Sequence, residues 1–278
     1  MDITSVQTFR RAATRADLAL TPGETVIAGG TWLMSEPQPT TTGFVDLTTL
    51  GWPDVEVVPE GLRVGATCTI ARLLDWARTE APAAWPATAI IPDAANALLA
   101  SFKIWNTATV GGNVCRSFAA GAMVSLCVAL DAVAEIWTPD GGERRQDVAA
   151  FVTGNGTNTL APGEVLRALV LPTRALRSRA TLRKIALAEH GRSGAVVTGR
   201  ADADGSSVFT VTAATLRPTV LRFERLPDAG TLADAVGTAS GYYSDPLGAA
   251  DWRRGVSIEL AERIRTELAE RSRTEPAA

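Results

Sequence analysis

Residues 25–31 read Thr-Val-Ile-Ala-Gly-Gly-Thr, and residues 108–114 read Ala-Thr-Val-Gly-Gly-Asn-Val. In both stretches, apolar and β-branched residues typical of a strand lead directly into a glycine pair. Because glycine has no Cβ, the backbone can turn sharply there and a ligand can approach its N–H groups. The two loops can therefore close on one diphosphate from both sides, each offering amide donors. For either pair taken alone, an ordinary glycine turn is the alternative.

The composition is that of a folded globular protein. The chain has 278 residues, enough for two or three compact units, with 46% hydrophobic and 21% charged residues. A net charge of -3 indicates no nucleic-acid partner and no anionic membrane surface. The longest uncharged stretch, Ser117 to Leu130, is too short to span a bilayer and predicts a buried helix.

The cysteines, Cys68, Cys115 and Cys127, are few and scattered. Their number is odd and no Cys-x-x-Cys occurs, which excludes a zinc ribbon and a self-contained iron–sulfur cluster. This usage fits a reducing compartment, and the first residues lack the features of a signal peptide. We therefore expect a cytoplasmic protein. Cys115 is interpreted as a buried small hydrophobe, with a reactive thiol as the alternative.

Helix and strand patterns interleave without strict alternation, which indicates an α+β fold. The patterns predict a first helix over residues 7–18, a helix over 94–102 and a long final helix over 249–271. The polar, basic stretch Thr173 to Ser178 predicts a domain boundary. Three strands are expected after it, two of them joined across the turn Asp202-Ala203-Asp204-Gly205.

Common catalytic motifs are absent. The sequence contains no Gly-x-Gly-x-x-Gly after a strand, no Walker phosphate loop and no Gly-x-Ser-x-Gly. Its single histidine, His190, lies in a glycine- and arginine-rich turn and is interpreted as a solvated turn residue rather than a general base. Because few residues are suited to acid–base catalysis, we expect a redox cofactor to carry the chemistry, and we assign no catalytic residue.

At the two glycine loops the chain resembles the FAD-binding (medium) subunit of molybdenum hydroxylases, the family of carbon monoxide dehydrogenase, nicotine dehydrogenase and the flavin domain of xanthine dehydrogenase. The family signature Ala-Gly-Gly-Thr/Gln-x-Leu is matched by Ala28 to Leu33, and Thr-Ile/Val-Gly-Gly-Asn-Ile/Val-Cys by Thr109 to Cys115. Shorter matches follow in the family's order: Val45-Asp46-Leu47, Leu62-Arg63-Val64-Gly65, Gly163-Glu164-Val165-Leu166 and Ala250-Asp251-Trp252-Arg253-Arg254.

The resemblance implies a fold and a cofactor. It implies a two-lobed FAD-binding domain of PCMH type over residues 1–174, with lobes of about 1–56 and 57–174. A C-terminal domain with an antiparallel sheet and helices would follow over 178–278. FAD would be bound by the two loops, with two further residues near the isoalloxazine. The implied residues are Val26, Ile27, Ala28, Gly29, Gly30, Thr31, Trp32, Leu33, Thr109, Val110, Gly111, Gly112 and Asn113, with Leu166 and Lys184 near the ring.

In this family, hydroxylation takes place at molybdopterin in a large subunit, and a small subunit carries two [2Fe–2S] clusters. The resemblance therefore implies both partners, with electrons passing from the clusters through FAD to an external acceptor. One alternative is a stand-alone FAD-dependent oxidoreductase that acts directly on a small molecule. Another is a non-catalytic scaffold with the same fold.

The chain departs from the family pattern near the two loops. After the second loop the family has Ser-Pro-x-x-Asp, and its aspartate contacts FAD. In this chain alanine replaces the proline at about Ala119 and the aspartate at Ala122, so one polar contact to FAD is lost. Trp105 stands where the family has an arginine, and core packing is favoured for it over stacking on a ring. Trp32 replaces a residue that is commonly Ser, Asp or Glu.

Overall fold

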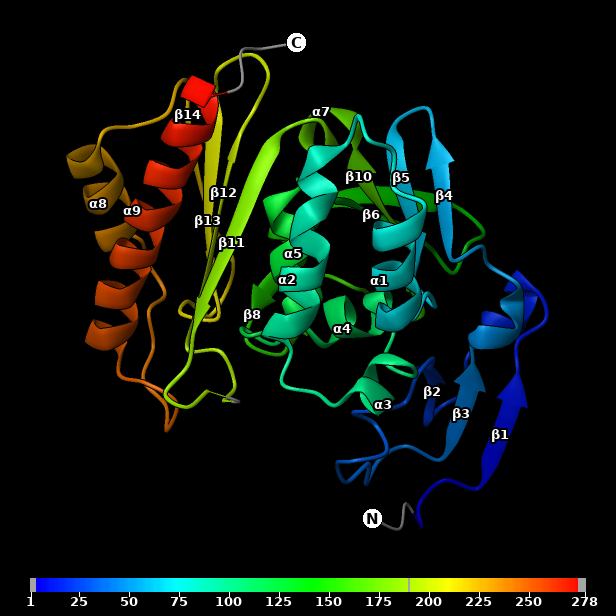
Figure 1. The fold of residues 1–278 in the computed structure, drawn as a ribbon. Helices are drawn as coiled ribbons and strands as arrows, with labels where there is room; N and C mark the ends of the chain where they lie inside the picture. The colour runs from blue at the N-terminus through cyan, green and yellow to red at the C-terminus, as the bar shows by residue number, and fades with distance from the viewer. Residues whose placement is uncertain (1–3, 190, 275–278) are drawn as a thin grey trace.

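The computed structural model describes residues 4–189 and 191–274. His190 lies outside the described residues, so its interpretation as a turn residue stays a prediction. The described chain contains helices together with parallel and antiparallel sheets, and the C-terminal sheet and its helices lie to one side of the rest (Figure 1). The α+β expectation is confirmed. Among the described helices, none combines the length and the apolar character that a bilayer span needs.

The first lobe contains a three-stranded parallel sheet in the order β1-β3-β2. The strands are β1 (Thr8–Arg11), β2 (Glu24–Ile27) and β3 (Gly43–Asp46), with 3-10 helices at Arg15–Leu18 and Thr48–Leu50. The helix predicted over residues 7–18 is therefore wrong. Thr8–Arg11 pairs with β3 in parallel, and Ala12 is buried beside Val45. This distant pairing outweighs the local helical pattern.

The second lobe is built on an antiparallel sheet in the order β4-β5-β10-β6-β7. Its strands are β4 (Val55–Val58), β5 (Gly61–Gly65), β6 (Val133–Trp137), β7 (Glu143–Asp147) and the central β10 (Val165–Pro172), and a separate pair is formed by β8 (Val152–Gly154) and β9 (Thr157–Asn158). The division expected at about residue 56 thus falls inside β4. Strand β10 is buried along nearly its whole length, as a central strand should be.

Helices of the second lobe cover this sheet. They are α1 (Ile70–Thr79), α2 (Ile90–Ala97), α3 (Phe102–Trp105), α4 (Val110–Arg116), α5 (Ala122–Ala129), α6 (Val148–Phe151) and α7 (Thr173–Leu176), with a 3-10 helix at Pro86–Ala89. Every residue of α5 is buried, which confirms the buried helix predicted within residues 117–130. The helix predicted over 94–102 begins earlier, because Pro92 is tolerated in a first turn, and ends where Leu98 turns extended.

The C-terminal part is a four-stranded antiparallel sheet in chain order, β11-β12-β13-β14. Its elements are β11 (Arg179–Ile185), β12 (Ala195–Ala201), β13 (Ser207–Thr212), β14 (Thr219–Phe223), α8 (Ala229–Gly237) and α9 (Ala250–Thr274). Helices α8 and α9 cover one face, while α2 and α5 of the second lobe pack on the other side (Figure 1). The sheet therefore lies between two helical layers, and its inner face supports the segment that follows the second glycine loop.

Two hydrogen bonds join that segment to the C-terminal sheet. The Ala213 N–H donates to the Ala119 carbonyl at 2.7 Å, and the hydroxyls of Ser125 and Thr212 lie 2.6 Å apart. All four residues are buried, so these bonds are shielded from water. The sheet therefore helps to position the start of α5, directly after the second glycine loop.

Candidate functional site

The two glycine loops lie directly against each other. A Cβ added at Gly29 would sit 1.9 Å from the carbonyl oxygen of Thr107 and 3.1 Å from the Cα of Ala108. Only glycine allows so close an approach of two backbones. In addition, Gly30 has φ +65, a left-handed conformation that favours glycine. The first pair is thus explained by contact with the residues that lead into the second loop.

The first loop presents a run of unused backbone donors. It follows β2 and turns through bonds from Met34 N–H to the Gly30 carbonyl at 2.8 Å and from Ser35 N–H to the Trp32 carbonyl at 3.0 Å. Within the described parts of the chain, the N–H groups of residues 29–33 donate to no protein acceptor. These residues are half-buried rather than open to solvent. Consecutive free N–H groups at a glycine turn suit an anion such as a diphosphate.

The second loop is built differently, because most of its amides are already used. It forms the first turn of α4, where Thr109 is the N-cap and its hydroxyl accepts from Gly112 N–H at 3.0 Å. Val110 N–H donates to the Cys68 carbonyl at 2.8 Å, and Gly111 N–H donates to the Ala66 carbonyl at 3.0 Å. The second loop therefore offers mainly a fixed wall, and the run of consecutive free amide donors belongs to the first loop.

Close packing also explains the second glycine pair. A Cβ at Gly111 would lie 2.5 Å from the Cβ of Ala66, and one at Gly112 would lie 2.7 Å from the Thr109 hydroxyl. Gly111 lets the backbone of α4 approach the turn after β5, and Gly112 leaves room for the N-cap hydroxyl of Thr109. Asn113 then links the loop to α5, because its side-chain oxygen accepts from Met123 N–H at 2.9 Å.

Asparagines of the β8–β9 turn hold the chain between α4 and α5. Asn158 donates to the Cys115 carbonyl at 2.7 Å, and Asn155 accepts from Ala119 N–H at 3.0 Å. Ala122, which stands in place of the family's aspartate, is completely buried at the first turn of α5. Polar contacts near the second loop therefore hold the backbone, and no carboxylate occupies this position.

A stack of an arginine and two aromatic rings stands beside the first loop. The guanidinium carbon of Arg116 lies 3.5 Å from the ring centroid of Trp32 and 4.5 Å from that of Phe118. The two rings meet edge to face, with centroids 5.9 Å apart. Sequence reasoning selected Trp32 but missed Arg116 and Phe118. The available signal was a cation placed directly after the second signature.

Leu166 and Lys184 occupy different sheets. Leu166 is a buried core residue of β10, a strand that packs against α4. Lys184 is exposed on β11 and donates to the Asn96 carbonyl of α2 at 2.8 Å. Within the described residues, that bond ties Lys184 to α2 rather than to either glycine loop. Their assignment to the isoalloxazine therefore stays a prediction.

The structure favours structural roles for Cys115 and Trp105. Burial raises the pKa of the Cys115 thiol to about 12, which leaves it protonated and a poor nucleophile near neutral pH. Trp105 packs against the main core, and its buried Nε1 has no hydrogen-bond partner among the described residues. In the part of the chain that the structure describes, no group of His, Cys, Asp and Glu is arranged to hold a metal ion.

Comparisons with known proteins agree with this geometry. The family model of the FAD binding domain in molybdopterin dehydrogenase matches residues 4–174. Quinoline 2-oxidoreductase from Pseudomonas putida 86 is similar in structure, with a TM-score of 0.80, 20% identity, and coverage of 97% of this chain and 99% of that chain. No curated protein sequence matches this one.

Two carbon monoxide dehydrogenases are equally similar in fold. The chain from Oligotropha carboxidovorans has a TM-score of 0.80 at 19% identity, covering 96% of this chain and 99% of that chain. The chain from Hydrogenophaga pseudoflava has a TM-score of 0.80 at 17% identity, covering 98% and 99%. The resemblance inferred from the glycine signatures is confirmed. The chain belongs to the family of FAD-binding domains of molybdopterin dehydrogenases, a family of flavoprotein oxidoreductases, and FAD is its cofactor.

Proposed function

We propose that this chain is the FAD-binding subunit of a molybdenum hydroxylase complex. In this role it takes electrons from the [2Fe–2S] clusters of a small partner subunit, while a large partner holds molybdopterin and the organic substrate. The observation that carries the proposal is the run of free N–H groups over residues 29–33, set against the rigid second loop. This arrangement is that of a dinucleotide site within a family whose domains bind FAD.

The residues of the site have distinct roles in this proposal. Val26 to Leu33 surround the FAD diphosphate, with the N–H groups of residues 29–33 as donors, and Thr109 to Asn113 hold the opposite wall in place through their internal bonds. Leu166 and Lys184 lie toward the isoalloxazine. When bound, FAD supplies the redox chemistry by accepting and releasing electrons. The chain itself binds and orients the cofactor and limits the access of water.

The state of the three cysteines is consistent with iron–sulfur clusters that are held by a partner subunit. Burial raises the pKa of Cys68, Cys115 and Cys127 to about 12. These thiols therefore stay protonated near neutral pH and are poor nucleophiles and poor metal ligands. The cysteines are free rather than paired, which supports a reducing, cytoplasmic location. We also propose a domain boundary between residues 174 and 178, because the family match ends at residue 174 and the next strand, β11, starts a new sheet.

The first experiment is the visible absorption spectrum of the chain purified alone. We expect the two flavin bands and, after heat release, about one FAD per chain. A colourless protein that also fails to take up added FAD would contradict the proposal and favour a scaffold.

Partner dependence is tested next, by rapid mixing of the FAD-loaded chain with the reduced small and large subunits. Flavin bleaching that requires the small subunit supports electron transfer from its clusters. Turnover of an organic substrate by the isolated chain would instead favour a stand-alone oxidoreductase.

A further inference from the structure

Arg116 is an arginine without a counter-ion. In the described parts of the chain its side chain makes no hydrogen bond or ion pair, and its Nε is buried without a partner. Burial lowers its pKa, and Glu36 acts on it only through a longer-range charge interaction. By contrast, the fully buried Arg200 and Arg253 each pair with an aspartate. An unpaired, partly buried cation is costly, yet Arg167 is in the same state among the described residues: it has a buried nitrogen without a partner and lies over Trp52 and Trp137. What distinguishes Arg116 is its place beside the free N–H groups of the first loop, and the two together favour an anion here.

The two aromatic rings hold the guanidinium in a defined position. Trp32 comes from the first loop, whereas Arg116 ends α4 and Phe118 lies on the chain toward α5. Contacts with the rings of Trp32 and Phe118 hold the guanidinium in place, and among the described residues no acceptor takes up its hydrogen-bond donors. Bonds from the β8–β9 turn hold the chain on either side of Arg116. The position of the cation is thus set before any ligand binds.

The cation stands beside the free donors of the first loop. Trp32 belongs to the segment whose N–H groups have no acceptor among the described residues, and its ring is 3.5 Å from the Arg116 guanidinium carbon. The second loop offers no such run of donors, because the N–H groups of residues 110–113 bond within the protein. The uncharged N–H donors of the first loop therefore have the full positive charge of Arg116 beside them.

We propose that Arg116, held between Trp32 and Phe118, supplies this site with its positive charge and contacts the negative charge of bound FAD. The inference rests on the proposed binding of FAD by the two loops. Two parts of FAD carry suitable charge, the diphosphate in both redox states and the isoalloxazine after reduction. A guanidinium recognises both by charge-assisted hydrogen bonds.

The test uses the full-length chain freed of flavin and the substitution Arg116→Met, which keeps length and removes charge. The dissociation constants of FAD and ADP are measured by titration, together with the midpoint potential of bound FAD. We expect FAD binding to weaken about tenfold or more, or the potential to fall. Equal weakening for ADP and FAD assigns the contact to the diphosphate. A lower potential with unchanged ADP binding assigns it to the reduced ring.

Two further variants separate charge from stacking and from folding. Arg116→Lys keeps the charge and is expected to recover part of the affinity or potential. Arg263→Met removes an exposed arginine of α9 that pairs with Glu259, and should change neither quantity. Circular dichroism confirms that each variant is folded. If Arg116→Met does not fold, Trp32→Leu, which removes the stacking partner, must weaken binding or lower the potential.

The inference and the proposed function fail in different ways. Unchanged FAD affinity, ADP affinity and potential in folded Arg116→Met would overturn the role of Arg116 while leaving FAD binding intact. A wild-type chain that binds no FAD would overturn both.

Discussion

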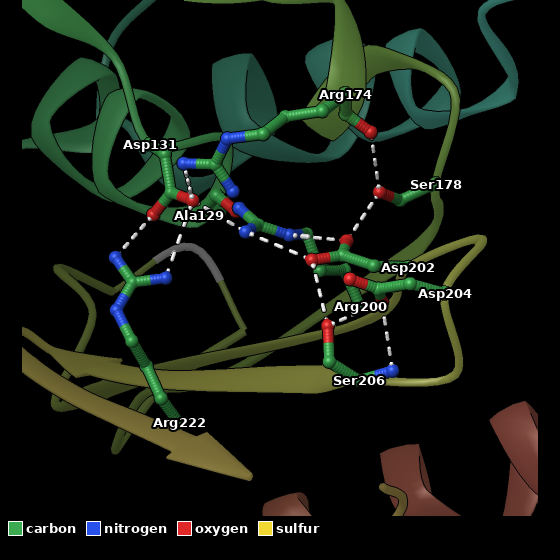
Figure 2. Close-up of polar contacts among 9 residues, drawn as sticks. All are labelled: Ala129, Asp131, Arg174, Ser178, Arg200, Asp202, Asp204, Ser206 and Arg222. Atoms are coloured by element: carbon green, nitrogen blue, oxygen red, sulfur yellow. Dashed lines mark hydrogen bonds and ion pairs between the residues drawn. The ribbon is translucent and has the colours of Figure 1, made fainter. Parts of the chain in front are cut away.

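Arg200 of β12 and Asp131, just after α5, form a buried ion pair that joins the C-terminal sheet to the second lobe (Figure 2). The side chain of Arg200 is only 1% exposed, and it also donates to the Ala129 carbonyl and to Asp202, each at 2.8 Å. Two exposed arginines, Arg174 and Arg222, reach the same Asp131 carboxylate at 2.7 Å. The Asp131 carboxylate thus pairs with three arginines, one before the proposed domain boundary and two after it.

Replacing Asp131 by asparagine should lower the free energy of unfolding by about 2 kcal/mol, because it removes one of the two carboxylates that balance the buried Arg200, the other being Asp202. Asparagine tolerates the left-handed backbone at this position, where φ is 49, so strain does not confuse the result. Urea denaturation measures the change. Asp204→Asn is the matched control, since the hydrogen bonds that the Asp204 side chain accepts within the described residues come from the neighbouring Ser206, and the variant should lose little stability. Equal stability of Asp131→Asn and wild type would contradict the structural role of the pair.

The same carboxylate predicts a loss of stability in acid. Burial raises the pKa of Asp131, but hydrogen bonds from Arg222 and Arg200 more than offset this and leave it at about 2, against an ordinary value of 3.8. Because the folded pKa is the lower one, the stabilisation is complete above pH 4 and is lost as the pH falls toward 2. It amounts to about 2 kcal/mol. Unfolding measured across this range should show a shallower pH dependence for Asp131→Asn, and identical slopes would assign the effect to other carboxylates.

Alanine at Gly29 should separate the two glycine loops. The new Cβ would meet the Thr107 carbonyl oxygen at 1.9 Å, and this oxygen belongs to the backbone and cannot rotate away. We expect a loss of about 2 kcal/mol in stability and a larger loss of FAD affinity. Gly255→Ala is the control, because nothing lies within 4 Å of its Cβ in α9 and alanine favours helices. Unchanged FAD titration for Gly29→Ala would show that the contact between the loops does not shape the site.

The thiols should be unreactive in the folded protein. Burial raises the pKa of all three cysteines to about 12. A disulfide reagent at pH 8 should therefore label none of them in native protein and all three in denaturant. Cys115→Ala should leave the FAD dissociation constant within a factor of about two, since its side chain only fills space. Rapid native labelling that this substitution abolishes would instead identify Cys115 as a reactive group beside the second loop.

Much of the local structure follows from the sequence. The hairpin of β4 and β5 is expected from the turn Pro59-Glu60-Gly61, which lies between two apolar runs. The buried helix α5 follows from an uncharged stretch, and the paired glycines indicate by themselves that another group approaches the backbone closely. These features were predictable because neighbouring residues carry the necessary information.

The structure corrects the sequence where distant partners decide the outcome. Residues 8–11 have a helical pattern but form β1, since β3 supplies hydrogen-bond partners from more than thirty residues later in the chain. Similarly, the sequence predicted amide donors from both loops. Bonds to the carbonyls of Ala66 and Cys68 use two N–H groups of the second loop, and no local pattern reveals these bonds.

The sequence by itself therefore determined the family, the cofactor and the two loops, because these depend on short motifs whose glycines are required locally. Tertiary structure alone decided which loop keeps free N–H groups, and which cation stands beside them. Arg116 meets Trp32 only because α4 packs against the first loop, and Arg200 meets Asp131 only because the C-terminal sheet packs on α5. Both contacts join residues far apart in the chain, and no periodicity or motif in the sequence identifies the partner of either arginine.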